Sequence, residues 1–200
     1  MSRTATLKTE LAELGARTEL GFDAGGDAVE RIKALADELE SLNPTPEPAR
    51  AAALLRGRWR LLYSSFGLQR DTTLARISFN AFPKTPVHVK SLFQEIDPAT
   101  GLYDNVVTFD GEDGMPGEAV TFGAYQVMDD RRLDVRFTDM LVSGPGVPVK
   151  LPIDNARIPP LYSDVVYLDD GFRLNRGSFG NLYVLEREDT APMRWAREGM

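Results

Sequence analysis

Two stretches near the start of the chain have the hydrophobic spacing of amphipathic helices. In the first, Leu7, Leu11 and Leu14 recur at intervals of four and three residues. In the second, one apolar stripe faces away from the charged residues and is formed by Val29, Ile32, Leu35, Leu39 and Leu42. We expect Asp27 to cap this second helix and the prolines at 44, 46 and 48 to end it. The chain therefore opens with a helical segment.

After Gly57 the pattern changes to the alternation and the β-branched and aromatic content of strands. We expect strands over residues 58–66, 76–82, 87–96, 102–110, 118–128, 132–142, 164–168, 172–177 and 181–187. The separators are turn sequences, and Asp170-Gly171 is the strongest hairpin signal. About eight or nine consecutive antiparallel strands form an up-and-down meander, and closing it into a barrel removes its exposed edges. The predicted fold is mainly β, an up-and-down antiparallel β-barrel behind an N-terminal helical segment.

The chain length sets the domain organisation. A chain of 200 residues is long enough for one domain with a real core. We expect residues 1–56 to form the helical segment packed on the barrel, residues 57–188 the barrel, and residues 189–200 a C-terminal tail.

Charge and composition exclude several classes of function. The 23 basic and 30 acidic residues give a net charge of −7, which argues against nucleic acid as a partner and against purely electrostatic docking on anionic lipid. The chain has no cysteine, so disulfides and thiol catalysis are absent. The N-terminus lacks the apolar stretch of a signal peptide and a helical pattern begins almost at once, so we expect no cleavable leader.

The stretch LLRGRWRLLYSSF, residues 54–66, predicts how one end of the barrel closes. Gly57 allows a tight turn and Trp59 fills that end with a large apolar ring. By strand alternation, Leu61 and Tyr63 share its face and line the interior. The same logic gives further lining residues, for each of which simple core packing is the alternative: Phe93, Val120, Phe122, Val135, Phe137, Val166 and Leu174. We expect either Arg173 or Arg176, but not both, to lie over the indole.

Residues 143–160 break the strand rhythm with five prolines, yet they carry several apolar side chains. This segment is predicted to cover the open end of the barrel, opposite Trp59. The alternative is an irregular edge strand packed on the N-terminal helices.

Few residues are candidates for chemistry. His88 is the only histidine and alternates with Val87 and Val89, so we expect it to face outward without a catalytic role. The acidic turn at 110–114 and the glycine turn at 176–180 lack the spacing of a calcium or a phosphate site. The sequence indicates no cofactor, no metal site and no catalytic residue.

Several blocks together resemble the plastid lipid-associated protein (fibrillin) family, whose domain is lipocalin-like. They are LKTELAELGARTELGF, LNPTPEP, LLRGRWRLLYSSF and VYLDDGFRLNRGSFGNLYVLER, in the family's order over nearly the whole chain. The chain departs from the family at TELGF, where an Asn/Asp-Arg-Gly element is usual. The resemblance implies a lipocalin-like barrel, and with no transit peptide expected it implies a bacterial or cyanobacterial-type member.

Two classes of function follow. The first is a carrier or structural protein for a hydrophobic small molecule, such as an isoprenoid, a quinone, a carotenoid or a fatty acyl lipid, held in the barrel, with peripheral association with membranes as a further expectation. The predicted ligand-binding residues are Trp59, Leu61, Tyr63, Phe93, Val120, Phe122, Val135, Phe137, Val166 and Arg173.

The alternatives are an enzyme in the same cavity, using Tyr63, Glu95 or Asp139, and an accessory protein that docks on a lipid-metabolising enzyme. We expect a cytoplasmic location at the inner face of a membrane, or a plastid location if the source is a phototrophic eukaryote whose transit peptide was removed.

Overall fold

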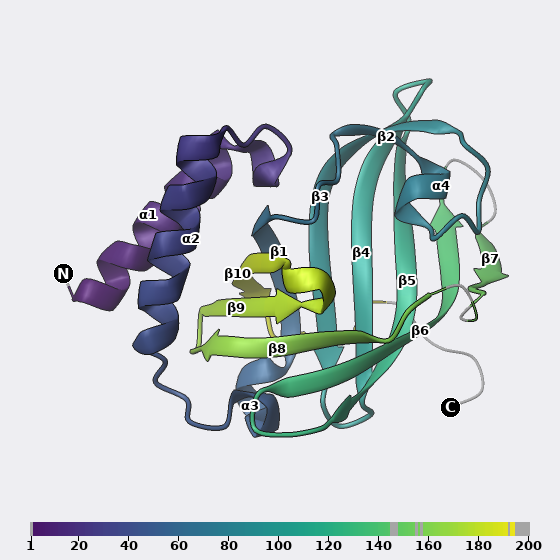
Figure 1. Ribbon diagram of the computed structural model, residues 1–200. Coiled ribbons are helices and arrows are strands. Elements are labelled where there is room, and N and C mark those ends of the chain that lie inside the picture. Colours follow the sequence, from purple (N-terminus) through teal and green to yellow (C-terminus); the bar gives the residue numbers. More distant parts are fainter. Residues whose placement is uncertain (1, 145–147, 155, 157, 192, 195–200) are drawn as a thin grey trace.

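The computed structural model describes the chain except residues 1, 145–147, 155, 157, 192 and 195–200. It is mainly β, as predicted: a barrel with two long helices against one side (Figure 1). The helices are α1 (Arg3–Arg17), α2 (Gly26–Ser41), α3 (Ala52–Leu55) and α4 (Leu74–Ile77), with 3₁₀ turns η1 (Glu19–Gly21), η2 (Pro48–Arg50) and η4 (Ser178–Gly180).

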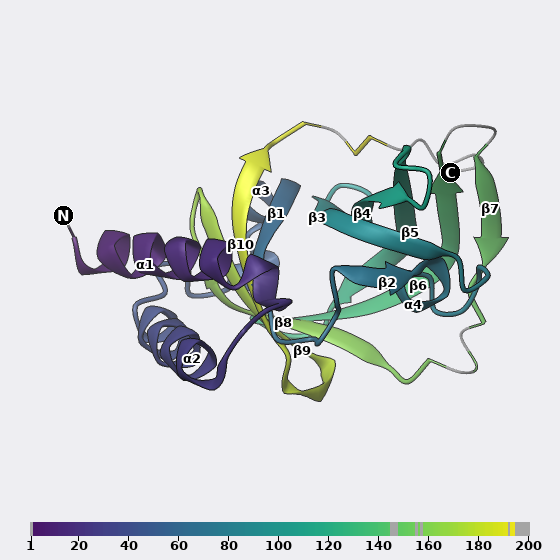
Figure 2. The same ribbon diagram turned by 90° about the horizontal axis from the view of Figure 1, so that it is seen from above.

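Eight antiparallel strands close the barrel in the order β1-β10-β9-β8-β6-β5-β4-β3, and β3 returns to β1 (Figure 2). They are β1 (Gly57–Ser64), β3 (Pro86–Asp97), β4 (Leu102–Gly111), β5 (Pro116–Val127), β6 (Arg132–Ser143), β8 (Leu161–Leu168), β9 (Phe172–Gly177) and β10 (Leu182–Asp189). The closing pair is short, since only Gly57–Arg60 of β1 meet Phe93–Ile96 of β3. The predicted up-and-down barrel is confirmed.

Two short strands lie beside the barrel. Strand β2 (Asp71–Thr73) pairs with β3, and β7 (Val149–Pro152) pairs with β6. Within the proline-rich segment 143–160, residues 149–152 are thus an edge strand, and residues 145–147, 155 and 157 lie outside the described residues. Strand β7 lies on the side of the barrel away from α1 and α2 (Figure 1), so the expected packing of this edge strand on the N-terminal helices is wrong.

The strand predicted over residues 76–82 is wrong. Its first residues end the short helix α4, and Phe79 and Asn80 then have positive φ angles of 52° and 63°. Thr73 starts the helix, because its hydroxyl accepts a hydrogen bond from the Arg76 backbone N–H at 3.3 Å.

Both N-terminal helices form as their apolar stripes predict. Leu7, Leu11 and Leu14 of α1 are buried, and so are Ile32, Leu35 and Leu39 of α2. The cap of α2 differs from the prediction: Gly25 occupies that position and Asp27 lies in the first turn, where a carboxylate still favours the helix dipole.

Breaks in strand pairing decide which side chains face the barrel interior. The pairing of β1 with β10 shifts between Leu61 and Tyr63, and that of β8 with β9 shifts between Val165 and Tyr167. A bulge of this kind inserts one residue and reverses the facing of those that follow. Tyr63 follows the first bulge and Val166 is the inserted residue of the second, and both pack under the helices and not in the interior, which corrects their predicted facing.

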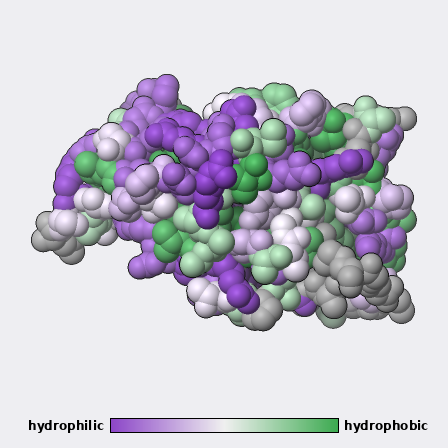
Figure 3. All heavy atoms as spheres, turned by 90° about the horizontal axis from the view of Figure 1, so that it is seen from below, coloured by the Kyte–Doolittle hydropathy of each residue, from purple (hydrophilic) through white to green (hydrophobic). Residues whose placement is uncertain are grey.

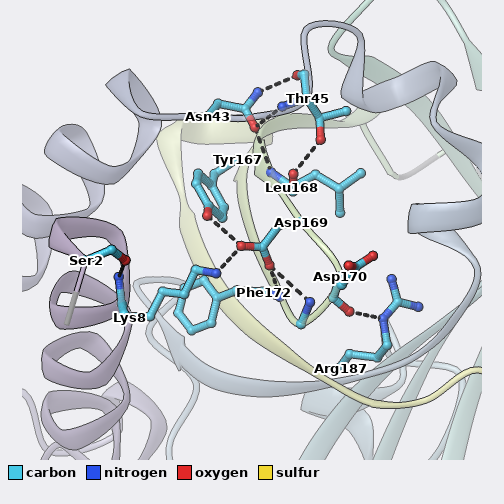
Figure 4. Close-up of polar contacts among 12 residues, drawn as sticks. Ser2, Lys8, Asn43, Thr45, Tyr167, Leu168, Asp169, Asp170, Phe172 and Arg187 are labelled. Carbon is cyan, nitrogen blue, oxygen red and sulfur yellow. Dashed lines mark hydrogen bonds and ion pairs between the residues drawn. The ribbon is translucent and has the colours of Figure 1, made fainter.

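A polar network fastens the helical segment to the β8–β9 hairpin (Figure 4). The Asp169 carboxylate accepts hydrogen bonds from Lys8 of α1, from the Tyr167 hydroxyl at 2.6 Å and from the Phe172 backbone N–H at 2.8 Å. In the linker, the Asn43 side chain accepts from the Leu168 backbone N–H at 3.0 Å, and the Thr45 hydroxyl donates to the Leu168 carbonyl at 2.6 Å. The sequence blocks LNPTPEP and VYLDDGF thus meet in space.

The view from below shows the outer surface on the side of α3 (Figure 3). Hydrophilic residues gather over the helical side, and hydrophobic residues lie in small separate groups. Among the described residues, no helix is both long and apolar enough to cross a bilayer.

Candidate ligand cavity

One end of the barrel is closed around Trp59. The indole is fully buried and its Nε1–H donates to the Leu55 carbonyl of α3 at 2.9 Å. The guanidinium carbon of Arg173 lies 4.8 Å from the ring centroid, which confirms the prediction that one of two arginines packs there. The other, Arg176, faces outward and pairs with Asp37 at 2.5 Å and Glu40 at 2.9 Å on α2.

A second cation reinforces this closed end. The guanidinium carbon of Arg187 lies 4.3 Å from the Trp59 centroid, and its nitrogens donate to the carbonyls of Leu54, Arg56 and Asp170. Arg187 thereby joins β10, the turn before β1 and the β8–β9 hairpin around one ring. Arg187 could not be predicted from the sequence, because its neighbours in β10 are charged and resemble an exposed strand end.

The other half of the barrel holds a cavity of about 360 Å³. Its walls combine strand residues with Phe22 after η1, with residues of α4 and of the turn that follows it, and with the segment after β1: Phe22, Leu61, Ser64, Phe66, Leu68, Ala75, Arg76, Ile77, Phe79, Asn80, Leu92, Phe93, Gln94, Asn105, Val106, Val107, Thr121, Phe137, Leu161 and Tyr183. Helix α4 lies at the end of the barrel opposite α3 (Figure 1). The cavity thus occupies the end opposite Trp59 and is of a size typical of small-molecule sites.

An adjoining pocket of about 100 Å³ extends the cavity and shares six of its wall residues. It reaches Tyr103, Ser163 and, at its rim, Phe179. Two aromatic rings near this opening are exposed: Phe79 is 41% exposed and Phe179 is 73% exposed. Both residues also have positive φ angles. Bulky residues rarely adopt this backbone region.

The predicted ligand-binding residues separate into three groups. Leu61 and Phe137 line the cavity and Val135 lines the adjoining pocket, whereas Phe93 only borders the cavity, because its ring belongs to an outward-facing cluster. Trp59 and Arg173 lie buried at the closed end. The residues outside these walls are Tyr63 and Val166, with Leu174, beneath the helices, and Val120 and Phe122, which pack with Phe93 and Val106 in a separate cluster.

Alternation explains the separate cluster. Val106 pairs with Val120 across β4 and β5, between the pairs Asn105–Thr121 and Val107–Ala119, whose members face the interior. Val120 therefore points to the outer face of the sheet. The Phe93 ring of the same cluster lies 3.7 Å from the guanidinium carbon of Arg58, which pairs with the buried Glu95.

Arg173 is the most unusual side chain near the cavity. It is fully buried, its Nη2 donates to the Gln94 side chain, and its Nε and Nη1 have no partner within the described structure. Burial lowers the pKa of Arg173 to about 10. Burial also raises the pKa of nearby Tyr103, an effect that the Arg173 charge partly offsets.

Comparison with known proteins gives the family. A sequence model of PAP_fibrillin matches residues 5–186 of the chain. The chain belongs to the PAP_fibrillin family. Its fibrillin relatives include "Probable plastid-lipid-associated protein 3, chloroplastic" of Arabidopsis thaliana, which is 28% identical over 94% of this chain and 59% of its own length.

Other fibrillin relatives are similarly distant. "Light-induced protein, chloroplastic" of Solanum tuberosum is 26% identical over 94% of this chain and 68% of its own length. "Chromoplast-specific carotenoid-associated protein, chromoplastic" of Cucumis sativus is 27% identical over 92% of this chain and 68% of its own length. The chain thus spans about three fifths of the length of the Arabidopsis relative. No solved structure matches this fibrillin sequence.

The other chemical candidates of this fibrillin lie apart from one another. His88 is exposed between the buried Val87 and Val89, as predicted, with its Nδ1 2.8 Å from the Asp71 carboxylate. Glu95 pairs with Arg58, and Asp139 lies 3.8 Å from Lys150. Within the described ranges, no three His, Cys, Asp or Glu side chains are grouped as a metal site would require.

The inward-facing polar residues of the cavity, Gln94, Asn105 and Thr121, were missed from the sequence. Gln94 directly follows the apolar Phe93, and Thr121 directly follows the apolar Val120, so each polar side chain points to the opposite face of its strand from its apolar neighbour. From the sequence alone, this alternation predicts that the polar side chains face solvent.

Proposed function

We propose that this fibrillin-family protein binds one hydrophobic small molecule in the barrel and carries or sequesters it. The observation that carries the proposal is the cavity of about 360 Å³ at the end opposite Trp59. Its strand walls present Leu61, Leu92, Val107 and Phe137, and burial of a ligand's apolar surface against such side chains supplies most of the affinity.

The names of the relatives support a lipid or carotenoid ligand, because they describe plastid-lipid-associated and carotenoid-associated proteins. A binding role without catalysis is favoured by the scatter of Tyr63, Glu95 and Asp139 over separate parts of the barrel. Isoprenoids, quinones, carotenoids and fatty acyl lipids are the ligand classes that we propose.

The rim of the cavity supports a peripheral association with lipid surfaces during loading. Phe66, Phe79 and Phe179 are 46%, 41% and 73% exposed, and all three belong to the walls of the cavity or its extension. Exposed aromatic side chains at an opening are suited to the interface between water and lipid. The chloroplast and chromoplast names of the relatives support the plastid alternative of the two predicted locations. The bacterial or cyanobacterial type and the division into residues 1–56, 57–188 and 189–200 stay predictions.

The test combines lipid identification with a blocked cavity. Organic-solvent extraction of the purified protein and mass spectrometry are expected to recover a hydrophobic molecule at up to one per chain. Leu92→Trp, which fills the cavity from β3, is expected to abolish retinol binding measured by retinol fluorescence. Val127→Trp, at an exposed position of β5, is the matched control and should bind as the wild type does. Retinol binding that is unchanged in Leu92→Trp would show that ligands bind elsewhere.

A further inference from the structure

A buried positive charge lies beneath the cavity without a compensating carboxylate among the described residues. Arg173 is fully buried, and the titratable groups that influence its pKa are Tyr103, Arg187 and Tyr125, none of them a carboxylate. Its Nε and Nη1 groups lack acceptors within the described structure. A buried guanidinium is costly unless it is paired and hydrogen-bonded, so an anion supplied from the cavity would compensate it.

Gln94 connects this charge to the cavity. A guanidinium has only donors, so the Gln94 side chain must turn its Oε1 toward Arg173, as observed. The NH₂ group of the same amide then points away from Arg173, and it donates to no other side chain or carbonyl in the described part of the chain. Gln94 lines both the cavity and its extension. Its NH₂ group, polarised by the hydrogen bond that the same amide accepts from Arg173, can therefore donate to a ligand in the cavity.

Gln94 belongs to a polar row that crosses three neighbouring strands at one level. It pairs with Asn105 of β4, and Asn105 pairs with Thr121 of β5. All three line the cavity, and the buried Asn105 Oδ1 has no hydrogen-bond partner in the described residues. On one side of this row the inward-facing wall residues Leu92 and Val107 pair with each other and are apolar, and on the other side, toward the closed end, lie the buried Ile96 and Tyr103. One polar band in an apolar cavity fits a ligand with a single polar end.

We propose that the ligand is an amphiphile of the fatty-acid type whose carboxylate lies against Gln94 and Asn105, above Arg173, with its chain directed toward the aromatic rim. This inference rests on the proposed ligand-binding function. The Gln94 NH₂ group donates to one carboxylate oxygen. The Asn105 amide can donate from its NH₂ group to the other oxygen as it stands, because the buried atom of this amide is its Oδ1.

Tyr183 provides a further donor in the same wall. Burial raises the pKa of Tyr183 to about 12, so its hydroxyl is neutral at physiological pH and keeps its proton. A neutral head group would use these donors but leave Arg173 without a counter-charge. The arrangement therefore selects a carboxylate over an alcohol or an ester of equal chain length.

The experiment compares three head groups on one hydrocarbon chain. Palmitate, hexadecanol and methyl palmitate are titrated into the delipidated full chain loaded with retinol, and displacement is followed by retinol fluorescence. Palmitate is expected to bind about tenfold more tightly than the two neutral ligands, the ratio that one charge-assisted hydrogen bond supports. Equal affinities for all three would overturn the carboxylate assignment and leave the carrier function standing. Binding of none of them, including retinol, would contradict the carrier function itself.

Gln94→Glu tests the polar row directly. The new carboxylate pairs with Arg173 inside the protein and repels palmitate, so the preference for palmitate should disappear while hexadecanol still binds. The melting temperature should be equal to or above that of the wild type, because the buried cation gains a partner. Gln126→Glu, the same change at an exposed position of β5, should keep the wild-type preference. Asn105→Asp is a second variant with the same added charge and the same expected loss. Retention of the palmitate preference in both cavity variants would refute the proposal.

Discussion

At the scale of single residues, Trp59 organises the closed end of the barrel. Its ring meets two guanidinium groups, at 4.8 Å and 4.3 Å, and its N–H completes a hydrogen bond to α3. The arginines differ in how their own hydrogen bonds are completed. Arg187 uses three backbone carbonyls, whereas Arg173 has a side-chain amide and two unpaired donor groups within the described structure. Arg187 therefore fixes the end, and Arg173 is available to the cavity.

We predict that Trp59→Ala lowers the free energy of unfolding by about 3–5 kcal/mol, since it removes a fully buried aromatic side chain and leaves a void. Urea unfolding followed by far-UV circular dichroism measures this loss. Trp59→Phe retains a ring beneath both cations and should lose clearly less. An unfolding midpoint unchanged in the alanine variant would show that the ring does not hold the closed end.

At the scale of elements, the β8–β9 hairpin is held to the N-terminal helices by a polar network, beside their apolar packing on β1 and β10. Asp169 stands at its turn and joins α1, through Lys8, to the hairpin backbone. Burial opposes ionisation of Asp169, but hydrogen bonds from Lys8, Tyr167 and the Gly171 backbone lower its pKa below the ordinary value. The carboxylate is therefore part of the fold rather than a free surface charge.

We predict that Asp169→Asn destabilises the protein by about 1–3 kcal/mol at pH 7, as expected for hydrogen bonds made to a charge. Because the folded-state pKa is depressed, the stabilisation is fully present above the unfolded pKa of about 4 and is lost as the pH falls through the folded value. Urea unfolding at a series of pH values should show the gap between wild type and variant closing below about pH 4. Asp170→Asn, at the exposed neighbouring position, should show a much smaller gap.

Much of the element order could be predicted from the sequence, because hydrophobic periodicity is a local property. The two helices, most of the strands and the Gly57-x-Trp59 closure follow from it. The facing of Tyr63 and Val166 could not be predicted, because Tyr63 follows a bulge and Val166 stands in one, and a bulge exists only where two strands pair. The helix α4 was read as a strand because its apolar spacing is short and ambiguous, and the cavity wall that it supplies was missed with it.

At the scale of the whole molecule, the two ends of the barrel have different chemistry. One end is sealed by Trp59 and α3, and the other opens between exposed aromatic rings on the segments after β1, α4 and β9. A net charge of −7 gives no general attraction to anionic membranes. Contact with lipid would therefore depend on the apolar rim.

We predict that the double variant Phe79→Ser and Phe179→Ser slows transfer of a fluorescent fatty acid from phosphatidylcholine vesicles to the protein several-fold, while equilibrium affinity changes little. Stopped-flow fluorescence gives the rate, and titration gives the affinity. Met128→Ser removes a side chain that is 55% exposed beside the β5–β6 turn, away from the cavity walls, and serves as the control. Equal transfer rates for wild type and double variant would show that the aromatic rim takes no part in ligand loading.

The closure of the barrel has a consequence for protein synthesis. Strand β1 pairs with β10, so the barrel cannot close until residues 182–189 have been synthesised and can pair with residues 57–64. Pairings this distant along the chain form late, and a ribosome delivers β10 well after the helices and β1 have emerged. Until then β1 has one unsatisfied edge, a state prone to intermolecular strand pairing. The cavity is accordingly the last feature of the nascent chain to form, and a hydrophobic ligand encountered earlier would meet an open sheet rather than a binding site.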